Sequence, residues 1–182
     1  MDRFVNSILS QAPGCPRSVI KQHVLKAAIR FCSETWVWQL KEDCLVLKGA
    51  VDVILSAPED AAITGILEFK LNGRDFQLYS RSGAVVSFDA PIFEDGIINI
   101  TKAFIPMRDA SALPDILHDE WFEGVEAGAL FSLRSMPEKP WTDSGGVRTA
   151  LSVFYSEIGK AKIRARLKND VAGTRVKSVR FI

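Results

Sequence analysis

The hydrophobic pattern of this chain changes period twice, and that change constrains the fold more than any other feature. Apolar residues follow the spacing of an amphipathic helix up to Thr35, and again from Leu113 to Lys168. Between these segments, from Trp36 to about Met107, short β-prone runs alternate with turn residues. The pattern therefore predicts a helical part that is interrupted by a β-rich segment.

The N-terminal segment predicts two helices. Residues 1–12 form the first, and Pro13-Gly14 then breaks it. The second runs from about Pro16 to Thr35. The residues expected to face inward are Phe4, Val5, Ile8 and Leu9 in the first helix, and Ile20, Val24, Ala27, Ala28, Phe31 and Thr35 in the second.

The C-terminal segment predicts a helical hairpin. Its first helix begins at Leu113-Pro114, where proline suits the first helical position. Its second helix begins near Thr142 or Asp143, either of which is a plausible cap. The first helix carries Gly124 and Gly128, a notch that another backbone could approach. We expect one core of Phe31, Trp121, Leu130, Trp141, Leu151, Phe154 and Ile158, with Tyr155, Ala161 and Ala165 on the same stripe.

The β-prone middle predicts five to seven short antiparallel strands in a small sheet or sandwich. Its strongest signal is Asn72-Gly73, a dipeptide typical of a tight hairpin turn. Because the region is too small to bury both faces alone, we expect it to pack on the helices or on a neighbour.

These expectations combine into an α+β fold: a bundle of about four helices with an antiparallel β-rich insertion between the second and third. The single domain of residues 1–182 would have a helical core (1–36 and 111–168), the insertion (37–110) and an extended C-terminal tail (169–182).

Composition excludes several classes of protein. Hydrophobic residues make up 47% and charged residues 25%, which is typical of a folded globular chain. No window resembles a membrane span or a secretory signal, so we expect synthesis in the cytoplasm. The net charge of +1 hides an asymmetry: residues 89–143 sum to −7 and residues 148–180 to +7. This is either an uneven solvated surface or two faces that meet different neighbours.

A search for catalytic or metal-binding groups predicts none. His23 lies on or beside an apolar helix face, and His118 has only a loose relation to Glu123 and Glu126. Cys15, Cys32 and Cys44 lack metal or redox spacing and are expected to be buried thiols. We therefore expect no catalytic residue, no cofactor and no enzyme.

Two segments are candidates for binding. Lys160, Lys162, Arg164, Arg166 and Lys168 form either a solvated helix end or a sequence-independent contact with DNA phosphates. The C-terminal segment alternates apolar and basic residues, which indicates either a frayed end or a strand added to a partner's sheet. Its candidate partner-binding residues are Val176, Lys177, Val179, Arg180, Phe181 and Ile182.

An ordered set of short motifs covers about residues 16–168. It comprises Ala27-Ala28, Phe31-Cys32, Thr35 and Trp38, then Leu113-Pro114-Asp115, Glu123, Glu126 with Gly128-Ala129-Leu130, Pro137, Lys139-Pro140-Trp141, Asp143, and finally Phe154, Ile158 and Lys160-Ala161-Lys162-Ile163-Arg164. In order and spacing, this set resembles the head-to-tail adaptor (connector, or neck) proteins of short-tailed bacteriophages.

The resemblance implies a structural virion protein in the neck of the particle. About twelve copies would form a ring that joins the portal protein to the tail nozzle or hub, and double-stranded DNA would pass through it without specific recognition. No membrane would be involved. Two alternatives remain: a head-completion (stopper) protein of a longer-tailed phage, and an enzyme that degrades the cell wall or processes nucleic acid.

Overall fold

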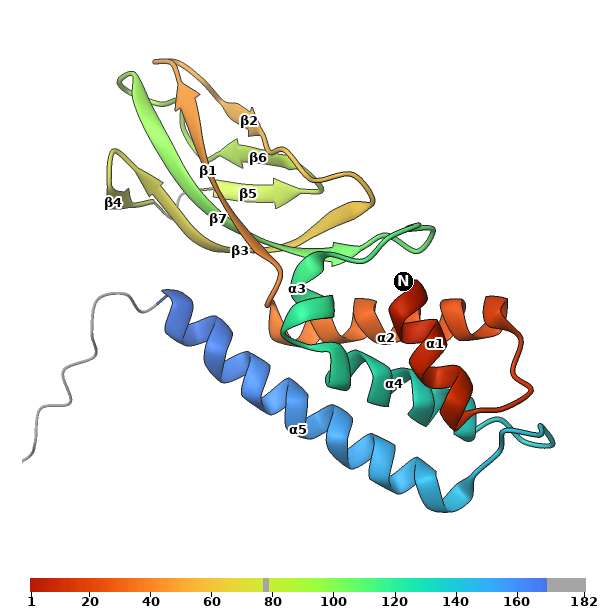
Figure 1. Cartoon of the computed structure of the whole chain (residues 1–182). Helices are drawn as coiled ribbons and strands as arrows, with labels where there is room; N and C mark the ends of the chain where they lie inside the picture. Colours follow the sequence, from red (N-terminus) through yellow and green to blue (C-terminus); the bar gives the residue numbers. More distant parts are fainter. Residues whose placement is uncertain (77–78, 170–182) are drawn as a thin grey trace, which may run out of the picture.

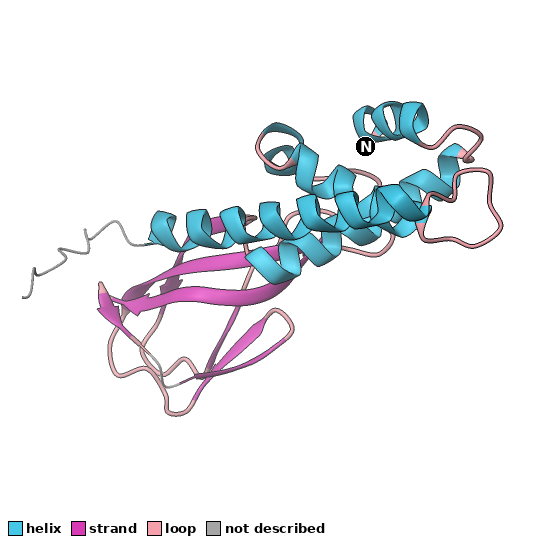
Figure 2. Cartoon of the chain, turned by 90° about the horizontal axis from the view of Figure 1, so that it is seen from below, coloured by secondary structure: helices cyan, strands magenta, loops and turns pink. Residues whose placement is uncertain are grey.

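The computed structural model describes residues 1–76 and 79–169 of the 182-residue chain. In Figure 1 its elements are α1 (Asp2–Gln11), α2 (Arg17–Thr35), β1 (Gln39–Val46), β2 (Asp52–Ile54), β3 (Ala61–Leu71), β4 (Arg74–Asp75), β5 (Tyr79–Ser82), β6 (Val85–Phe88), β7 (Gly96–Pro106), α3 (Asp115–Asp119), α4 (Phe122–Arg134) and α5 (Ser144–Asn169). The helices form one layer, and the strands lie on one side of it (Figure 2). None of the helices in the described residues has the length and apolar character that a membrane crossing requires.

The predicted bundle of about four helices with a β-rich insertion is wrong. The described residues form five helices and two antiparallel sheets, with strand orders β1-β7-β3-β4 and β2-β6-β5. The strands have a hydrophobic cluster of their own, separate from the helical one, to which Ile98 and Ile100 contribute from the larger sheet and Val86 from the smaller. The two sheets bury part of each other's inner faces in this cluster, and the end of β7 nearest Pro106 packs on α2, as expected from the small size of the β region. The predicted tail lies outside the described residues beyond Asn169, which itself ends α5.

The first two helices confirm the prediction from sequence. Pro16 stands at the N-cap of α2, and the buried residues of α1 and α2 include nearly all of those expected to face inward. Leu9 is only partly buried, and His23 and Cys32 join the buried face. Local periodicity was sufficient here because one apolar stripe on each helix faces a single core.

The predicted third helix is interrupted. Pro114 is the N-cap of α3, which ends at Asp119, and the backbone at Trp121 leaves the helical conformation (φ −127°, ψ 25°) before α4 begins. The break turns the Trp121 ring toward Phe31, with the ring centroids 5.7 Å apart. The helical spacing continued through this point in the sequence, so a tertiary contact decided the outcome.

The notch on α4 receives aromatic side chains. A Cβ atom added at Gly124 would lie 2.8 Å from the Phe31 ring, and one added at Gly128 would lie 2.7 Å from the Phe154 ring. The two glycines therefore let one ring from α2 and one from α5 approach the α4 backbone. Around this contact, Trp121, Leu130, Phe154 and Ile158 join the core as predicted. Leu151 and Trp141 are only partly buried, and Tyr155 is exposed.

The helix α5 begins as the sequence indicated. The Asp143 carboxylate accepts a hydrogen bond of 2.9 Å from the Gly146 amide, and its carbonyl accepts one from Val147. This arrangement satisfies amides that have no partner within the first helical turn.

The larger sheet confirms the predicted hairpin. Leu71 pairs with Arg74 across the Asn72-Gly73 turn, where both turn residues have positive φ (50° and 77°). The central strand β7 runs antiparallel to both β1 and β3. Its end nearest Pro106 contacts α2, which joins the sheet to the helical layer.

One lysine lies in the interior of the β region. The Lys102 side chain is 2% exposed and forms an ion pair with Glu42 of β1. Its ammonium group also donates a hydrogen bond of 2.6 Å to the Ser56 carbonyl. A buried charge needs such partners, because an unpaired one would pay a large desolvation cost.

We expect the α4 notch to be sensitive to a single methyl group. Gly128→Ala should lower the free energy of unfolding by about 1–3 kcal/mol, because the new Cβ would overlap the Phe154 ring. The matched control is Gly159→Ala in α5, where an added Cβ meets nothing within 4 Å. It should raise stability by about 0.5–1 kcal/mol. Urea unfolding measures both, and equal effects of the two substitutions would contradict this packing.

Stability should also depend on the charge of Glu42. Burial raises the pKa of this carboxyl group, but hydrogen bonds from Lys102 and Ser56 lower it more, so its pKa lies below the ordinary value. A lowered pKa stabilises the fold fully above about pH 4.3, the ordinary value, and this stabilisation is lost as the pH falls through the folded-state pKa.

Glu42→Gln should therefore destabilise the protein at pH 7 by about 3 kcal/mol, because it leaves the buried Lys102 ammonium without its carboxylate partner. The difference in urea midpoint between parent and variant should shrink below about pH 4. A difference that stays constant from pH 3 to pH 7 would contradict the assignment.

Candidate assembly surfaces

The structure places only part of the predicted binding residues. Lys168 lies in the last turn of α5, but its side chain is outside the described part of the chain. The predicted partner-binding residues Val176, Lys177, Val179, Arg180, Phe181 and Ile182 also lie outside the described residues. The described members of the basic series are Lys160, Lys162, Arg164 and Arg166.

Two lysines of the series pair with acids of the same chain. Lys160 Nζ lies 2.6 Å from Glu157 Oε1, one turn earlier on α5, and this hydrogen bond raises the pKa of the lysine. Lys162 Nζ lies 3.7 Å from Glu34 Oε2 on α2. These contacts hold the two cations at the α5 surface.

The two arginines differ from each other. Arg164 Nη2 lies 3.0 Å from Glu120 Oε1, and its guanidinium carbon lies 5.9 Å from the centre of the Trp121 ring. Arg164 therefore fastens α5 to the break between α3 and α4. Arg166 forms no ion pair with any other described residue and lines a groove.

This groove lies between the end of α2, the middle of β3 and the second half of α5. It encloses about 600 Å³ and is lined by Glu34, Thr35, Trp36, Ile66, Leu67, Lys162, Ala165 and Arg166. Trp36 ends α2 with a φ of 56°, a conformation that is uncommon for a large residue. Its indole lies against Gly65, where a Cβ would come within 2.9 Å of the ring. The groove thus combines an aromatic wall with two cations and one carboxylate.

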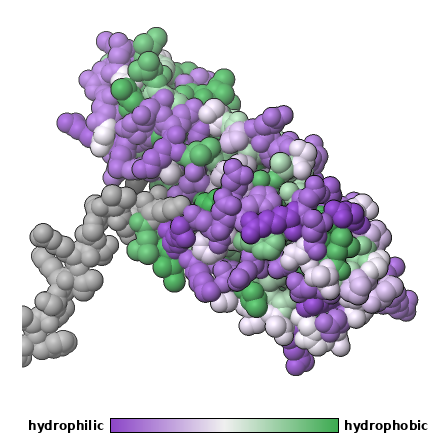
Figure 3. Space-filling view, in the orientation of Figure 1, coloured by the Kyte–Doolittle hydropathy of each residue, from purple (hydrophilic) through white to green (hydrophobic). Residues whose placement is uncertain are grey.

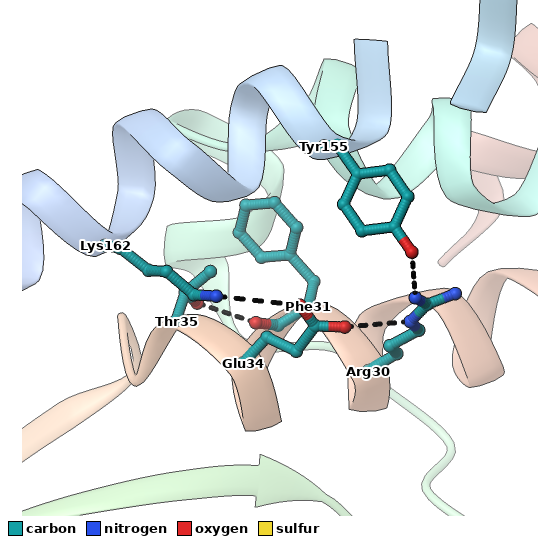
Figure 4. A network of polar contacts seen from close by, with 6 residues as sticks. All are labelled: Arg30, Phe31, Glu34, Thr35, Tyr155 and Lys162. Atoms are coloured by element: carbon teal, nitrogen blue, oxygen red, sulfur yellow. Dashed lines mark hydrogen bonds and ion pairs between the residues drawn. The ribbon is translucent and has the colours of Figure 1, made fainter. Parts of the chain in front are cut away.

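A polar network connects α2 to α5 beside the groove (Figure 4). The Glu34 carboxylate accepts a hydrogen bond of 2.9 Å from Arg30 Nε and pairs with Lys162. Arg30 Nη2 lies 2.6 Å from the Tyr155 hydroxyl, which explains why this aromatic residue is not in the core. The hydrogen bond to Glu34 outweighs the opposing effect of burial and raises the pKa of Arg30.

Large apolar side chains are exposed at the end of the β region far from the helices. Leu45 of β1 pairs in register with Ile97 of β7, and their side chains are 83% and 45% exposed. Figure 3 shows apolar residues gathered at this end of the molecule. The exposed residues there are Leu45, Leu47, Val51, Phe93 and Ile97. Sequence reasoning missed this surface, although an aromatic residue such as Phe93 inside a turn between Pro91 and Glu94 was an available signal.

The histidines and cysteines lie in separate structural environments. His23 is buried, and its Nδ1 lies 2.8 Å from Ser132 Oγ; burial lowers its pKa, as does nearby Lys26. The His118 ring packs 4.9 Å from the Phe4 ring, and burial lowers its pKa too. Burial raises the pKa of Cys32 to about 12, which keeps the thiol protonated.

The remaining thiols and acids do not form a recognisable centre. Cys15 is buried as expected and Cys44 is half-buried, and burial raises the pKa of both. Within residues 1–76 and 79–169, no three His, Cys, Asp or Glu side chains come together in a way that could hold a metal ion. The described residues do form surfaces suited to binding, namely the groove beside Arg166 and the exposed apolar end of the β region.

No protein-family model matches the sequence, and no curated protein shows significant similarity to it.

Proposed function

We propose that this chain is a structural adaptor in the neck of a short-tailed bacteriophage. Several copies, about twelve by the resemblance, would form a ring between the portal protein and the tail nozzle or hub. Its work would be binding rather than catalysis, and the genome would pass through the ring.

The observation that carries the proposal is the convergence of the residues that resemble the adaptor family. They are scattered over about 140 positions, yet most of the apolar ones meet in one helical core, while the charged ones lie at its surface. Ala28 and Phe31 of α2 pack with Trp121 and with Phe154 of α5. Gly128 of α4 admits the Phe154 ring. Several residues that resemble the adaptor family in sequence thus pack against one another in the fold.

The exposed apolar surfaces support a role in assembly. A monomeric protein seldom exposes a large contiguous apolar patch, and such patches often mark interfaces. This chain exposes apolar side chains at the end of the β region, and also Ile163 (62% exposed) and Leu167 (65%) on the second half of α5. A subunit that contacts neighbours at more than one surface suits a ring between two other protein layers.

The basic series supports only weak contact with DNA. Three of its four described cations already pair with Glu157, Glu34 or Glu120. Each of these three cations would have to leave its carboxylate in order to meet a phosphate. Two side chains on the same part of α5, Ile163 and Leu167, are apolar. Any contact with passing DNA would therefore be general and sensitive to salt, with Arg166 as the cation best placed to make it.

The role in the neck predicts a defined assembly defect. Particles made without this protein should package DNA in portal-containing heads but lack attached tails. Purified protein added to those heads should restore tail attachment, which can be scored by negative-stain electron microscopy. A protein of matched size without relation to the neck is the control. Tails that attach equally well without the chain would exclude the role.

The proposed DNA contact predicts a difference between two charge reversals on α5. Arg166→Glu should lower affinity for duplex DNA at low salt without changing sequence preference, because only phosphates would be contacted. Arg148→Glu, an exposed substitution near the other end of α5, is the matched control and should have a smaller effect. Fluorescence anisotropy with two unrelated duplexes measures both. Affinity that does not change between 50 and about 200 mM salt would contradict phosphate contact.

A further inference from the structure

A second groove lies along α2, on the side of Arg30 that leads to the end of β7. It encloses about 590 Å³. Leu25 and Ile29 supply its apolar surface, and Lys26 and Arg108 its charge. Arg108 follows the end of β7, so the groove is formed where the sheet meets the helical layer.

The charge of this groove is not balanced within the subunit. No carboxylate lines the groove. Arg30, at its border, is already bonded to Glu34 and Tyr155. The side chains of Lys26 and Arg108 form no ion pair or hydrogen bond with another described residue. Two cations beside an apolar floor fit an acidic segment that also carries a hydrophobic side chain.

The loop before β7 has this chemistry. Phe93 is 85% exposed and is followed directly by Glu94 and Asp95. Each acid has one oxygen in an internal hydrogen bond, to Asn72 and to the Lys48 amide respectively, which leaves its second oxygen for another donor. The loop therefore presents an aromatic ring beside two carboxylates.

The loop is also fixed in place. The Ile92 amide donates to the Ala50 carbonyl (3.0 Å), and the Ile92 carbonyl accepts from the Gly49 amide (2.7 Å). With the Asp95–Lys48 hydrogen bond, these contacts hold the loop on both sides of Phe93. A preorganised loop loses little conformational freedom on binding, which favours a stable contact.

The loop and the groove stand at opposite ends of one strand. Phe93 precedes the first residue of β7 and Arg108 follows its last, and β7 itself contributes 11 residues between them. At about 3.3 Å per residue, the strand separates them by roughly 36 Å. A subunit therefore cannot insert its own loop into its own groove, whereas a second copy can. Contacts between unlike surfaces of identical subunits generate rings or filaments.

We propose that the Phe93 loop of one copy docks into the α2 groove of the next copy. The Phe93 ring packs on Leu25 and Ile29, and the carboxylates of Glu94 and Asp95 face Lys26 and Arg108. The proposal deepens the proposed function, since it names the contact that would join neighbouring subunits of the ring. An aromatic residue surrounded by charge pairs is a common centre of binding energy in protein interfaces.

Two substitutions test the two sides of the contact separately. Phe93→Ala removes the ring from the loop, and Arg108→Glu reverses one charge of the groove. Each should weaken self-association of the full chain at least about tenfold, as measured by sedimentation velocity up to about 1 mM protein. Both positions are exposed, and thermal melts should match those of the parent. Arg148→Glu, with the same charge change on α5, should associate like the parent.

Mixing the two variants provides the decisive measurement. The Arg108→Glu protein keeps an intact loop, and the Phe93→Ala protein keeps an intact groove. An equimolar mixture should form a 1:1 dimer that does not grow further, because only one productive contact remains. A mixture that stays monomeric, or a parent that is monomeric at 1 mM, would overturn the proposal.

Two other outcomes would also overturn it. One is self-association that is unaffected by either substitution, which would place the subunit contact elsewhere. The other is a loss of duplex-DNA affinity with Arg108→Glu but no change in self-association, which would make the groove a phosphate site. Neither bears on tail attachment, so the adaptor role is judged by the experiment with tail-less particles.

Discussion

The contact of two aromatic rings with two glycines of α4 sets the geometry on which the rest of the helical layer depends. Phe31 from α2 and Phe154 from α5 approach the α4 backbone at Gly124 and Gly128, closer than any side chain there would permit. Because tightly packed interiors transmit small displacements, the position of α4 fixes those of α2 and α5. The α2–α5 network of Arg30, Glu34, Tyr155 and Lys162 can form only at this spacing.

The C-terminal end of α2 extends this constraint to the β region. Trp36 ends α2 in a left-handed conformation, which turns the chain toward the sheet. Its indole rests on Gly65, beside an irregularity in the β3–β7 pairing. Two residues later, the Trp38 carbonyl accepts a hydrogen bond from the Phe104 amide. The direction of β1, and therefore the place where Leu45 and the Phe93 loop are presented, follows from how α2 ends.

Local signals predicted the elements that local interactions decide. The bounds of α1 and α2, the cap at Asp143 and the hairpin at Asn72-Gly73 depend on periodicity, one carboxylate and a turn dipeptide. Two wrong predictions involve contacts between distant segments. The break at Trp121 and the exposure of Tyr155 each depend on a partner from another element, which periodicity cannot show. The burial of Lys102, which was not predicted, depends on such a partner too. For the same reason, the division of the strands into two sheets with their own core was not predicted.

The charge asymmetry illustrates how distance in sequence can mislead. The acidic stretch 89–143 and the basic stretch 148–180 suggested two opposed faces, yet Glu120 of the first pairs with Arg164 of the second. Part of the asymmetry is thus neutralised inside the subunit. The charges that the fold leaves uncompensated include Lys26 and Arg108 near one end of β7, and the second carboxylate oxygens of Glu94 and Asp95 near the other. Because β7 holds these opposite charges too far apart to meet within one subunit, the cations of one copy can pair with the carboxylates of the loop only in a second copy.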